Sequence, residues 1–437
     1  MSGVSSATGI ERELRAICGE ENVSEEGTFA HHFLPDPGHP IVVAKPGSAE
    51  EVAAILQLAN AEGLSIIPEG GNTNRCILQP ADILLRTSRL TQVEHYDHAD
   101  LTVGVGAGMT VARLNNMVSA DRLLFALDPP FPERATVGGV LATASHGPLR
   151  HGYGALRDFC IGIRFVTGDG RRAKGGGRVV KNVAGYDLMK LLIGSYGTLA
   201  VITSASFKLF PASRQTRTYL AEFSTAAEAL KFRDLMLRLP LSPVCLELVS
   251  PGARKLMRPE MASDAWVICV RAAGSDAVLT RYRKELGAAV TRELEGDGES
   301  KMWRAIERFP FASDAESENG TLADYGQRIQ ITVPPRDVMS VVDALNDIDK
   351  RGKIGVAFMG RIGVGHVLAV VGNNDSNLEE AAGVVVDVLR RKFGADINVK
   401  IGSAANPWPI APADLACMCA VKQALDPKNV LRGRTIF

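Results

Sequence analysis

The 437-residue sequence lacks any charge imbalance, because 49 basic residues are matched by 49 acidic ones. Nucleic-acid-binding proteins rely on a positive field to bind phosphates, so we expect no nucleic-acid partner. The sequence also lacks a run of about 18 apolar residues, the length that a membrane-spanning helix needs. Residues 1–13 lack the apolar segment of a secretory signal. We therefore expect a folded, cytoplasmic protein.

Clustered cysteines are missing as well. The seven cysteines are scattered in an odd number, and no Cys-x-x-Cys pair occurs among them. Cys417-Met418-Cys419 falls in a predicted helix over 414–425, where packing is the simplest role. An iron–sulfur cluster requires a full set of thiolate ligands close together. The sequence therefore predicts reduced thiols and no cluster.

The first half of the chain alternates short apolar strands with helices. Residues 41–44 predict a strand, and Ser48 with Glu51 forms a capping box for a helix that Gly63 ends. Residues 64–67 predict a second strand, which a glycine turn follows. Further expected elements are strands over 82–86, 101–105 and 199–209, helices over 10–18, 111–124, 138–144 and 186–193, and a hairpin over 161–180 around Gly168-Asp169-Gly170.

Beyond Pro211 the pattern changes to two β-α-β runs. Such runs predict an antiparallel sheet backed by helices, so we expect the α+β fold class and a domain boundary near residue 213. The charged segment 292–320 predicts a loop, apart from 302–309. The expected strands are 219–223, 245–249, 266–270, 328–333 and a pair within 354–371, and the expected helices are 226–239, 278–286 and 338–348.

The stretch "PEGGNTN", residues 68–74, follows the second predicted strand and lacks the lysine of a nucleotide-triphosphate loop. Gly70 and Gly71 permit a close approach of backbone amides to a ligand. The side chains of Asn72, Thr73 and Asn74 offer hydrogen bonds to phosphate oxygens. On this stretch alone, an anion-binding nest and a plain turn both remain open.

A second glycine-rich segment covers residues 135–147. Gly138 and Gly139 stand where a helix begins, so free amides and a partial charge of roughly +0.5 would face a bound anion. Glycine-mediated helix packing is the alternative.

A third segment, 182–202, places glycines between a helix and a strand. Gly104-Val105-Gly106-Ala107-Gly108 lacks the spacing of a dinucleotide fingerprint.

In their order and spacing, these three segments resemble the FAD-binding domain of the vanillyl-alcohol oxidase and p-cresol methylhydroxylase (PCMH) superfamily. The resemblance covers 42–211, and residues 177–203 are most similar to the FAD-binding glycolate oxidase subunits of the GlcE type. The tail 424–437 matches more weakly. The resemblance implies an N-terminal helical extension over 1–36, a two-part PCMH-type FAD-binding domain over 37–213, and an α+β cap domain with a helical tail over 214–437.

The resemblance also implies a role for each segment. The first would wrap the FAD pyrophosphate, the second would contact phosphate, ribitol and flavin, and the third would line the adenine end. Because Asn72 and Thr73 stand where some relatives attach flavin through a histidine, we expect non-covalent FAD. The implied cofactor-binding residues are Pro68, Glu69, Gly70, Gly71, Asn72, Thr73, Asn74, Thr136, Gly138, Gly139, Ala142, Ser145, His146, Gly147, Gly197 and Ile202.

Catalytic residues are harder to assign. In the glycolate oxidases that this sequence resembles, a second, catalytic FAD-linked subunit carries a G-H-x-G-D-G-N-x-H motif that binds metal and substrate. The nearest match here is residues 365–370, which keep only His366 of the motif's ligands. One histidine does not make a transition-metal site, so we expect no metal. Oxidation of a 2-hydroxy acid needs a base and a cation beside the flavin. Arg328, Arg361 and His366 are candidates, with structural ion pairs or a satisfied strand histidine as alternatives.

Electrons would leave this chain through a partner. The resemblance implies a sister FAD-linked subunit and an iron–sulfur subunit that serve the membrane quinone pool, with peripheral membrane association only through that complex. The expected function is the FAD-binding subunit of a glycolate oxidase, which converts glycolate to glyoxylate. A stand-alone FAD-dependent oxidoreductase of another hydroxy acid or alcohol, and a non-catalytic flavin-bearing assembly or electron-relay subunit, are the alternatives.

Overall fold

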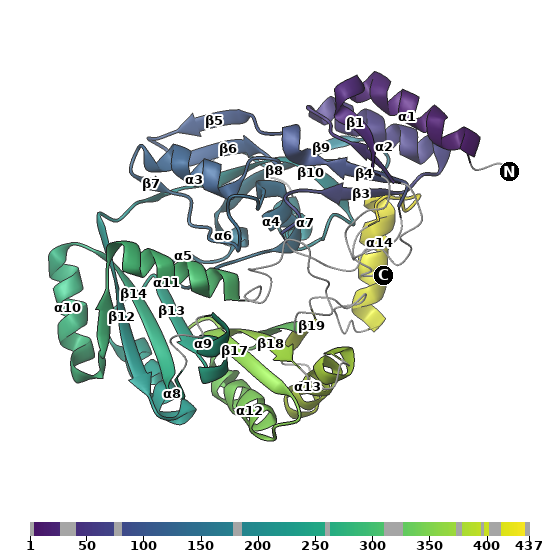
Figure 1. Cartoon of the computed structure of the whole chain (residues 1–437). Helices are drawn as coiled ribbons and strands as arrows, with labels where there is room; N and C mark the ends of the chain where they lie inside the picture. The colour runs from purple at the N-terminus through teal and green to yellow at the C-terminus, as the bar shows by residue number, and fades with distance from the viewer. Residues whose placement is uncertain are drawn as a thin grey trace. The chain divides into compact units, whose positions relative to one another are not determined.

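The computed structural model describes residues 4–26, 41–73, 81–177, 186–257, 263–309, 327–372, 378–394, 397–401 and 412–432. Its backbone divides into two compact units, whose elements are labelled in Figure 1. Unit 1 comprises Met1–His146, Gly154–Ala212 and Ile410–Phe437, and unit 2 comprises Gly147–Tyr153 and Ser213–Pro409.

The units differ from the expected domains in three places. The C-terminal segment belongs to unit 1 and not to the cap, because Leu431 forms a parallel bridge with Ile66. Helix α1 (Val4–Cys18) is not a separate extension, since Leu14 is buried in the same apolar cluster as Ile55. Residues 147–153 belong to unit 2.

The first sheet of unit 1 has the strand order β1-β2-β4-β3 and is built around a crossover helix. Helix α2 (Ala49–Glu62) begins where Ser48 Oγ accepts from the Glu51 amide and ends at Gly63, whose φ is 69°. The Glu51 carboxylate accepts from the Gly47 amide, one residue before the cap. β2 and β3 run parallel to β4, as strands joined by such a crossover do. The strands are β1 (Val23–Glu26), β2 (Ile41–Ala44), β3 (Ile66–Glu69) and β4 (Ile83–Arg86).

The second sheet of unit 1 is antiparallel, in the order β5-β6-β10-β8-β9. The expected hairpin forms around Gly170, but its second strand is 172–176, and residues 178–180 lie outside the described residues. The expected helix over 111–124 stops at Ser119, because the chain leaves it to pair β7 with β11. The remaining elements are β5 (Val93–Asp97), β6 (Thr102–Gly106), β7 (Leu123–Leu124), β8 (Cys160–Thr167), β9 (Arg172–Gly176), β10 (Ala200–Lys208), β11 (Phe210–Pro211), α3 (Val111–Ser119), α4 (Val137–Thr143), α6 (Leu156–Phe159), α7 (Leu188–Leu192) and α14 (Pro412–Leu425).

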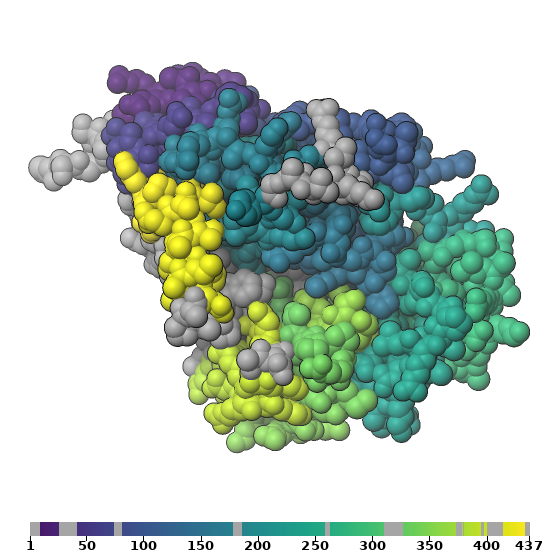
Figure 2. Space-filling model, turned by 180° about the vertical axis from the view of Figure 1, so that it is seen from behind, coloured from purple at the N-terminus to yellow at the C-terminus, as the bar shows by residue number. Residues whose placement is uncertain are grey.

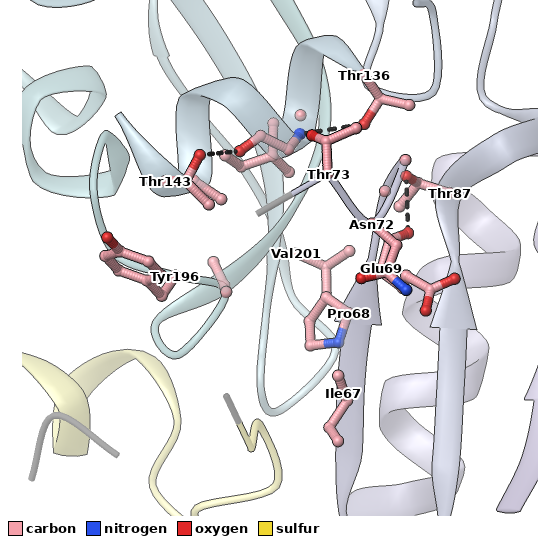
Figure 3. A pocket seen from close by; sticks show the side chains of 18 residues that line it. Ile67, Pro68, Glu69, Asn72, Thr73, Thr87, Thr136, Thr143, Tyr196 and Val201 are labelled. Atoms are coloured by element: carbon pink, nitrogen blue, oxygen red, sulfur yellow. Dashed lines mark hydrogen bonds between the residues drawn. The ribbon is translucent and has the colours of Figure 1, made fainter. Parts of the chain in front are cut away.

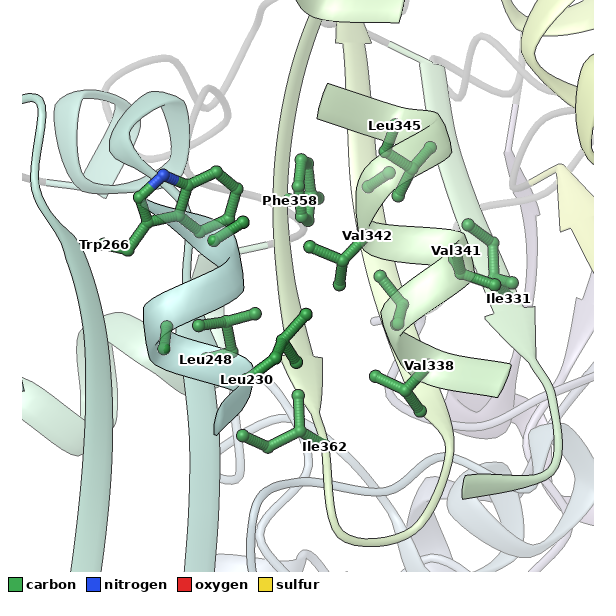
Figure 4. Close-up of a cluster of buried hydrophobic side chains, with 14 of the residues drawn as sticks. Leu230, Leu248, Trp266, Ile331, Val338, Val341, Val342, Leu345, Phe358 and Ile362 are labelled. Carbon is green, nitrogen blue, oxygen red and sulfur yellow. The ribbon is translucent and has the colours of Figure 1, made fainter. Parts of the chain in front are cut away.

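Unit 2 is built on an antiparallel sheet in the order β15-β12-β14-β13-β17-β18-β16-β19. Helices α8, α10, α12 and α13 bury their apolar faces on one side of it, where Leu230 and Val342 meet Phe358 (Figure 4). The expected α+β fold class is confirmed. The elements are α5 (Arg150–Tyr153), β12 (Gln215–Phe223), α8 (Ala226–Arg238), β13 (Cys245–Val249), α9 (Pro251–Met257), β14 (Trp266–Gly274), α10 (Asp276–Leu286), β15 (Arg292–Leu294), α11 (Gly296–Arg308), β16 (Gln327–Thr332), α12 (Val338–Lys350), β17 (Gly355–Arg361), β18 (His366–Gly372), α13 (Leu378–Phe393) and β19 (Asn398–Ile401).

The prediction of a loop over 292–320, which excepted 302–309, is wrong for residues 292–301. β15 and α11 occupy residues 292–308, and Trp303 of α11 is buried on the sheet face opposite the four helices. Glu299 is also buried, and its carboxylate pairs with Arg271 Nε at 3.1 Å and accepts from Thr218 Oγ1 at 2.9 Å. A charged sequence therefore forms a packed helix, because its buried charge is satisfied. Residues 310–326 lie outside the described residues.

Candidate functional site

A pocket in unit 1 brings the three glycine-rich segments together (Figure 3). Most of the predicted cofactor-binding residues line it. Ser145, His146 and Gly147 follow α4 and are not among its lining residues, and Asn74 lies outside the described residues. The lining residues are Ile67, Pro68, Glu69, Gly70, Gly71, Asn72, Thr73, Thr87, Thr136, Gly138, Gly139, Ala142, Thr143, Tyr196, Gly197, Ala200, Val201 and Ile202.

The two glycines of the first segment fit this loop against the second segment. A Cβ atom at Gly71 would lie 1.7 Å from the carbonyl oxygen of Arg134, and one at Gly70 would lie 2.2 Å from Thr136 Oγ1. Real Cβ atoms do not approach other atoms so closely. The glycines are therefore required by contact with the protein itself, and not only by the approach of a ligand as the sequence suggested.

The predicted free amides at the start of α4 are absent from the structure. The Val137 amide donates to Met109 O at 2.8 Å, and the Gly138 amide donates to Ala107 O at 2.8 Å. The Gly139 amide donates to the capping hydroxyl of Thr136 at 3.3 Å. The prediction failed because the acceptors Ala107 and Met109 lie on a distant segment of the chain and Thr136 caps the remaining amide. Gly138 instead permits tight packing, since a Cβ atom there would lie 2.8 Å from the Cβ of Ala107.

Free amides occur in the first segment. Among the residues that the structure describes, none accepts a hydrogen bond from the amides of Gly71, Asn72 and Thr73. Asn72 has a left-handed backbone with φ of 50°. Successive amides at such a turn form a concave anion site. No lysine or arginine is among the described lining residues, so a diphosphate here would be held by backbone amides and the side chains of Asn72 and Thr73.

Glu69 adds a negative charge at the edge of this pocket, but the charge is balanced. The Glu69 carboxylate accepts from Arg86 Nε at 2.6 Å, across the parallel pair of β3 and β4. Thr87 Oγ1 donates to the Glu69 carbonyl at 3.2 Å.

The pocket is also lined by residues that the sequence analysis did not predict, among them Ile67, Thr87 and Tyr196. The signal for Tyr196 in the sequence was its neighbour Gly197, because glycine favours a turn with positive φ, and the structure has φ of 55° at Tyr196 and 75° at Gly197.

Unit 2 places two of the three catalytic candidates together. Arg361 and His366 are directly paired on β17 and β18, and Arg361 Nη1 lies 3.2 Å from His366 Nδ1. Glu247 of β13, which the sequence analysis did not select, approaches Arg361 Nε at 3.4 Å. All three side chains are buried. Arg328 lies apart from this pair. It is opposite Val370, which follows His366 by four positions on β18, and four residues span roughly 13 Å along a strand.

The contact between Arg361 and His366 decides the tautomer of the histidine. A guanidinium carries only donors, so Nδ1 of His366 must accept the hydrogen bond. The ring proton then resides on Nε2. In this arrangement His366 is a hydrogen-bond donor, and the sequence-based interpretation of a general base is not favoured. Within the described ranges, no group of three or more His, Cys, Asp or Glu side chains is placed to hold a metal ion.

Comparisons with known proteins agree with this geometry. Residues 40–176 match the family model "FAD binding domain". The D-2-hydroxyglutarate dehydrogenase of Xanthomonas citri pv. viticola is 32% identical over 91% of this chain and 89% of its own. The crystal structure of p-cresol methylhydroxylase with substrate bound shares the fold, with a TM-score of 0.76, 14% identity, and coverage of 98% of this chain and 96% of that one.

Two glycolate oxidase subunits are also similar. The GlcE subunit of Escherichia coli is 35% identical, but over only 35% of this chain and 44% of its own. The GlcD subunit of Bacillus subtilis is 25% identical over 98% of this chain and 96% of its own. The expected GlcE likeness therefore covers only 35% of the chain, and the full-length likeness is to the GlcD type. The chain belongs to the family of FAD-linked oxidoreductases that includes the D-2-hydroxyglutarate dehydrogenases and these glycolate oxidase subunits.

Proposed function

We propose that this chain is the FAD-bearing subunit of a glycolate-oxidase-type dehydrogenase, which oxidises the C2 hydroxyl of a small 2-hydroxy acid. The observation that carries the proposal is a row of three amides, at Gly71, Asn72 and Thr73 of unit 1, from which no described residue accepts a hydrogen bond. It is supported by full-length likeness to relatives named for glycolate and D-2-hydroxyglutarate, both 2-hydroxy acids.

Bound FAD would supply a two-electron acceptor for the hydride of the substrate. The amides of residues 71–73 would hold the diphosphate, and the apolar side chains of Ile67, Val201 and Ile202 would exclude water from the rest of the cofactor. Binding would be non-covalent, because Asn72 and Thr73 stand where some relatives attach the flavin through a histidine. Ser145, His146 and Gly147 stay proposed contacts that this pocket does not include.

Unit 2 offers donors for the substrate carboxylate. Arg361 pairs with Glu247 and donates to Nδ1 of His366, which leaves the ring proton of His366 on Nε2. Charged hydrogen bonds from an arginine orient a carboxylate firmly. We assign Arg361 and His366 to substrate binding in this proposal. Arg328 remains a weaker candidate, because it lies apart from the pair.

Electron transfer to a partner is part of the same proposal. The partners would be a sister FAD-linked subunit and an iron–sulfur subunit, and contact with a membrane would occur through them. The names of two similar proteins, subunits GlcD and GlcE of glycolate oxidase, support an assembly of several subunits. Among the described residues, no helix is both long and apolar enough to cross a membrane.

A second candidate is a flavin-bearing relay subunit that does not oxidise substrate itself. It is favoured by residues 365–370, where only His366 remains of the metal and substrate motif. Anaerobic mixing of the FAD-loaded chain with glycolate, D-lactate or D-2-hydroxyglutarate separates the two. Bleaching of the flavin by one of these acids in the isolated chain supports the dehydrogenase. Bleaching only after a sister subunit is added supports the relay, and no bleaching in either case rejects both.

A further inference from the structure

The C-terminal segment of unit 1 adds a short strand beside the FAD pocket. The Ile66 amide donates to Val430 O at 2.8 Å, and the Arg432 amide donates to Ile66 O at 2.7 Å. Leu431 thereby pairs in parallel with Ile66, the residue before Ile67 of the pocket. Figure 2 shows this segment in yellow against the purple and blue part of the same unit.

Lys422 of α14 connects this strand to the opposite wall. Its ammonium group donates to Thr198 O at 2.7 Å, to Leu431 O at 3.0 Å and to the carboxylate of Asp426. Thr198 directly follows Gly197, which lines the pocket. The three donors of the ammonium are thus all used, and two of them hold main-chain carbonyls from different parts of unit 1.

Asp426 completes the connection. Its side chain is fully buried, that of Lys422 is 11% exposed, and the carboxylate also accepts from the amides of Val430 at 2.9 Å and Leu431 at 2.8 Å. Burial lowers the pKa of Lys422, and Asp426 acts in the opposite direction. A buried ion pair of this kind is favourable only when its remaining donors and acceptors are satisfied, as they are here.

We propose that Lys422 is a positioning residue for FAD, which fixes the 196–202 wall to β3 through Asp426 and the 430–432 strand. The inference rests on the proposed FAD pocket, since Thr198 and Ile66 each adjoin a residue that lines it. Lys422 does not line the pocket itself, so its effect on the cofactor is through the geometry of the two walls.

The first test is equilibrium binding of FAD to the full chain. Lys422→Met should raise the Kd for FAD by at least about tenfold, because it frees both walls. Lys422→Arg should retain more affinity than Lys422→Met. The matched control is Lys428→Met: Lys428 is an exposed lysine of the same segment that donates to Asn60 O at 2.9 Å in α2. The Kd of the Lys428→Met variant for FAD should stay within about twofold of the wild-type value. Equal losses in Lys422→Met and Lys428→Met overturn the proposal.

The second test does not depend on FAD. Hydrogen exchange of the cofactor-free chain should become faster over 66–69 and 198–202 in Lys422→Met, with no change over Cys245–Val249 of unit 2. Asp426→Asn should give the same pattern, which keeps the test available if Lys422→Met does not fold. Unchanged exchange in both walls overturns the proposal. Failure of the wild-type chain to bind FAD would reject the proposed function, while hydrogen exchange would still decide the role of Lys422.

Discussion

The carbonyl oxygen of Arg134 lies 1.7 Å from the position that a Cβ atom at Gly71 would occupy. The first glycine-rich segment is therefore in backbone contact with the start of the second, and residues 71–73 line the pocket beside this contact. Any side chain at position 71 must push the two segments apart.

Gly71→Ala should consequently weaken FAD binding. Overpacking against a backbone carbonyl, which has little freedom to move, costs about 1–3 kcal/mol in folded proteins. We expect a lower midpoint of thermal unfolding and at least about tenfold weaker FAD binding by fluorescence titration. Gly9→Ala is the matched control in unit 1, because a Cβ atom there meets nothing within 4 Å. Wild-type affinity in Gly71→Ala would contradict the described contact.

Thr136→Val should destabilise unit 1 through the loss of one oxygen. Thr136 Oγ1 caps α4 by accepting from the Gly139 amide, and the side chain is 5% exposed. Removal of such a cap costs about 1 kcal/mol. Urea unfolding measures the change. Thr136→Ser keeps the hydroxyl and should lose less stability than the valine variant, and the reverse order would refute the capping role.

His366 should be found as the Nε2-protonated tautomer. Arg361 Nη1 donates to His366 Nδ1, and this donor keeps the proton off Nδ1. Nitrogen-15 NMR of histidine-labelled protein distinguishes the tautomers. Arg361→Met should shift the ring toward a mixture, because the directing donor is gone. Observation of a proton on Nδ1 in the wild-type chain would show that the pair is arranged differently.

Stability should fall at alkaline pH because of buried thiols. Burial raises the pKa of Cys160 from 9.0 to about 12, and raises that of Cys18 to about 11. Between pH 9 and these values the folded chain keeps protons that the unfolded chain has released, so the free energy of unfolding decreases as pH rises. Each such thiol contributes a slope of about 1.4 kcal/mol per pH unit.

Urea unfolding of reduced protein from pH 8 to pH 10.5 measures this slope. Cys160→Ala removes one of the titrating thiols and should make the decrease shallower above pH 9. The alanine variant is less stable at neutral pH as well, so the comparison is between slopes and not between absolute stabilities. An unchanged slope would mean that the thiol of Cys160 titrates alike in both states.

The sequence predicted the elements that local pattern determines. Ser48 caps α2 and Gly63 ends it as expected, because both effects act within one or two turns of the helix. The convergence of three glycine-rich segments followed from a family resemblance, and the structure brings most of their predicted residues into one pocket. The pocket's role in holding FAD stays a prediction.

The sequence could not show hydrogen bonds and ion pairs between residues that lie far apart in the chain. The α4 amides are taken by carbonyls of Ala107 and Met109, and the C-terminal segment joins unit 1 through Ile66. Glu299 belongs to the charged segment that was expected to form a loop, but it lies on α11 and pairs with Arg271 of β14. Glu247 had a local signal, an acid within the apolar strand β13, yet its partner Arg361 is known only from the fold.

No group in the described part of the chain accepts from the amides of residues 71–73, and we expect these amides to bind the diphosphate of FAD. Titration of the purified, flavin-free chain with FAD and with riboflavin tests it most directly, since riboflavin has the same ring and no phosphate. We expect one FAD bound per chain, without a covalent link, and riboflavin binding weaker by at least about a hundredfold. A chain that stays colourless with FAD, or that binds riboflavin as tightly, would contradict it.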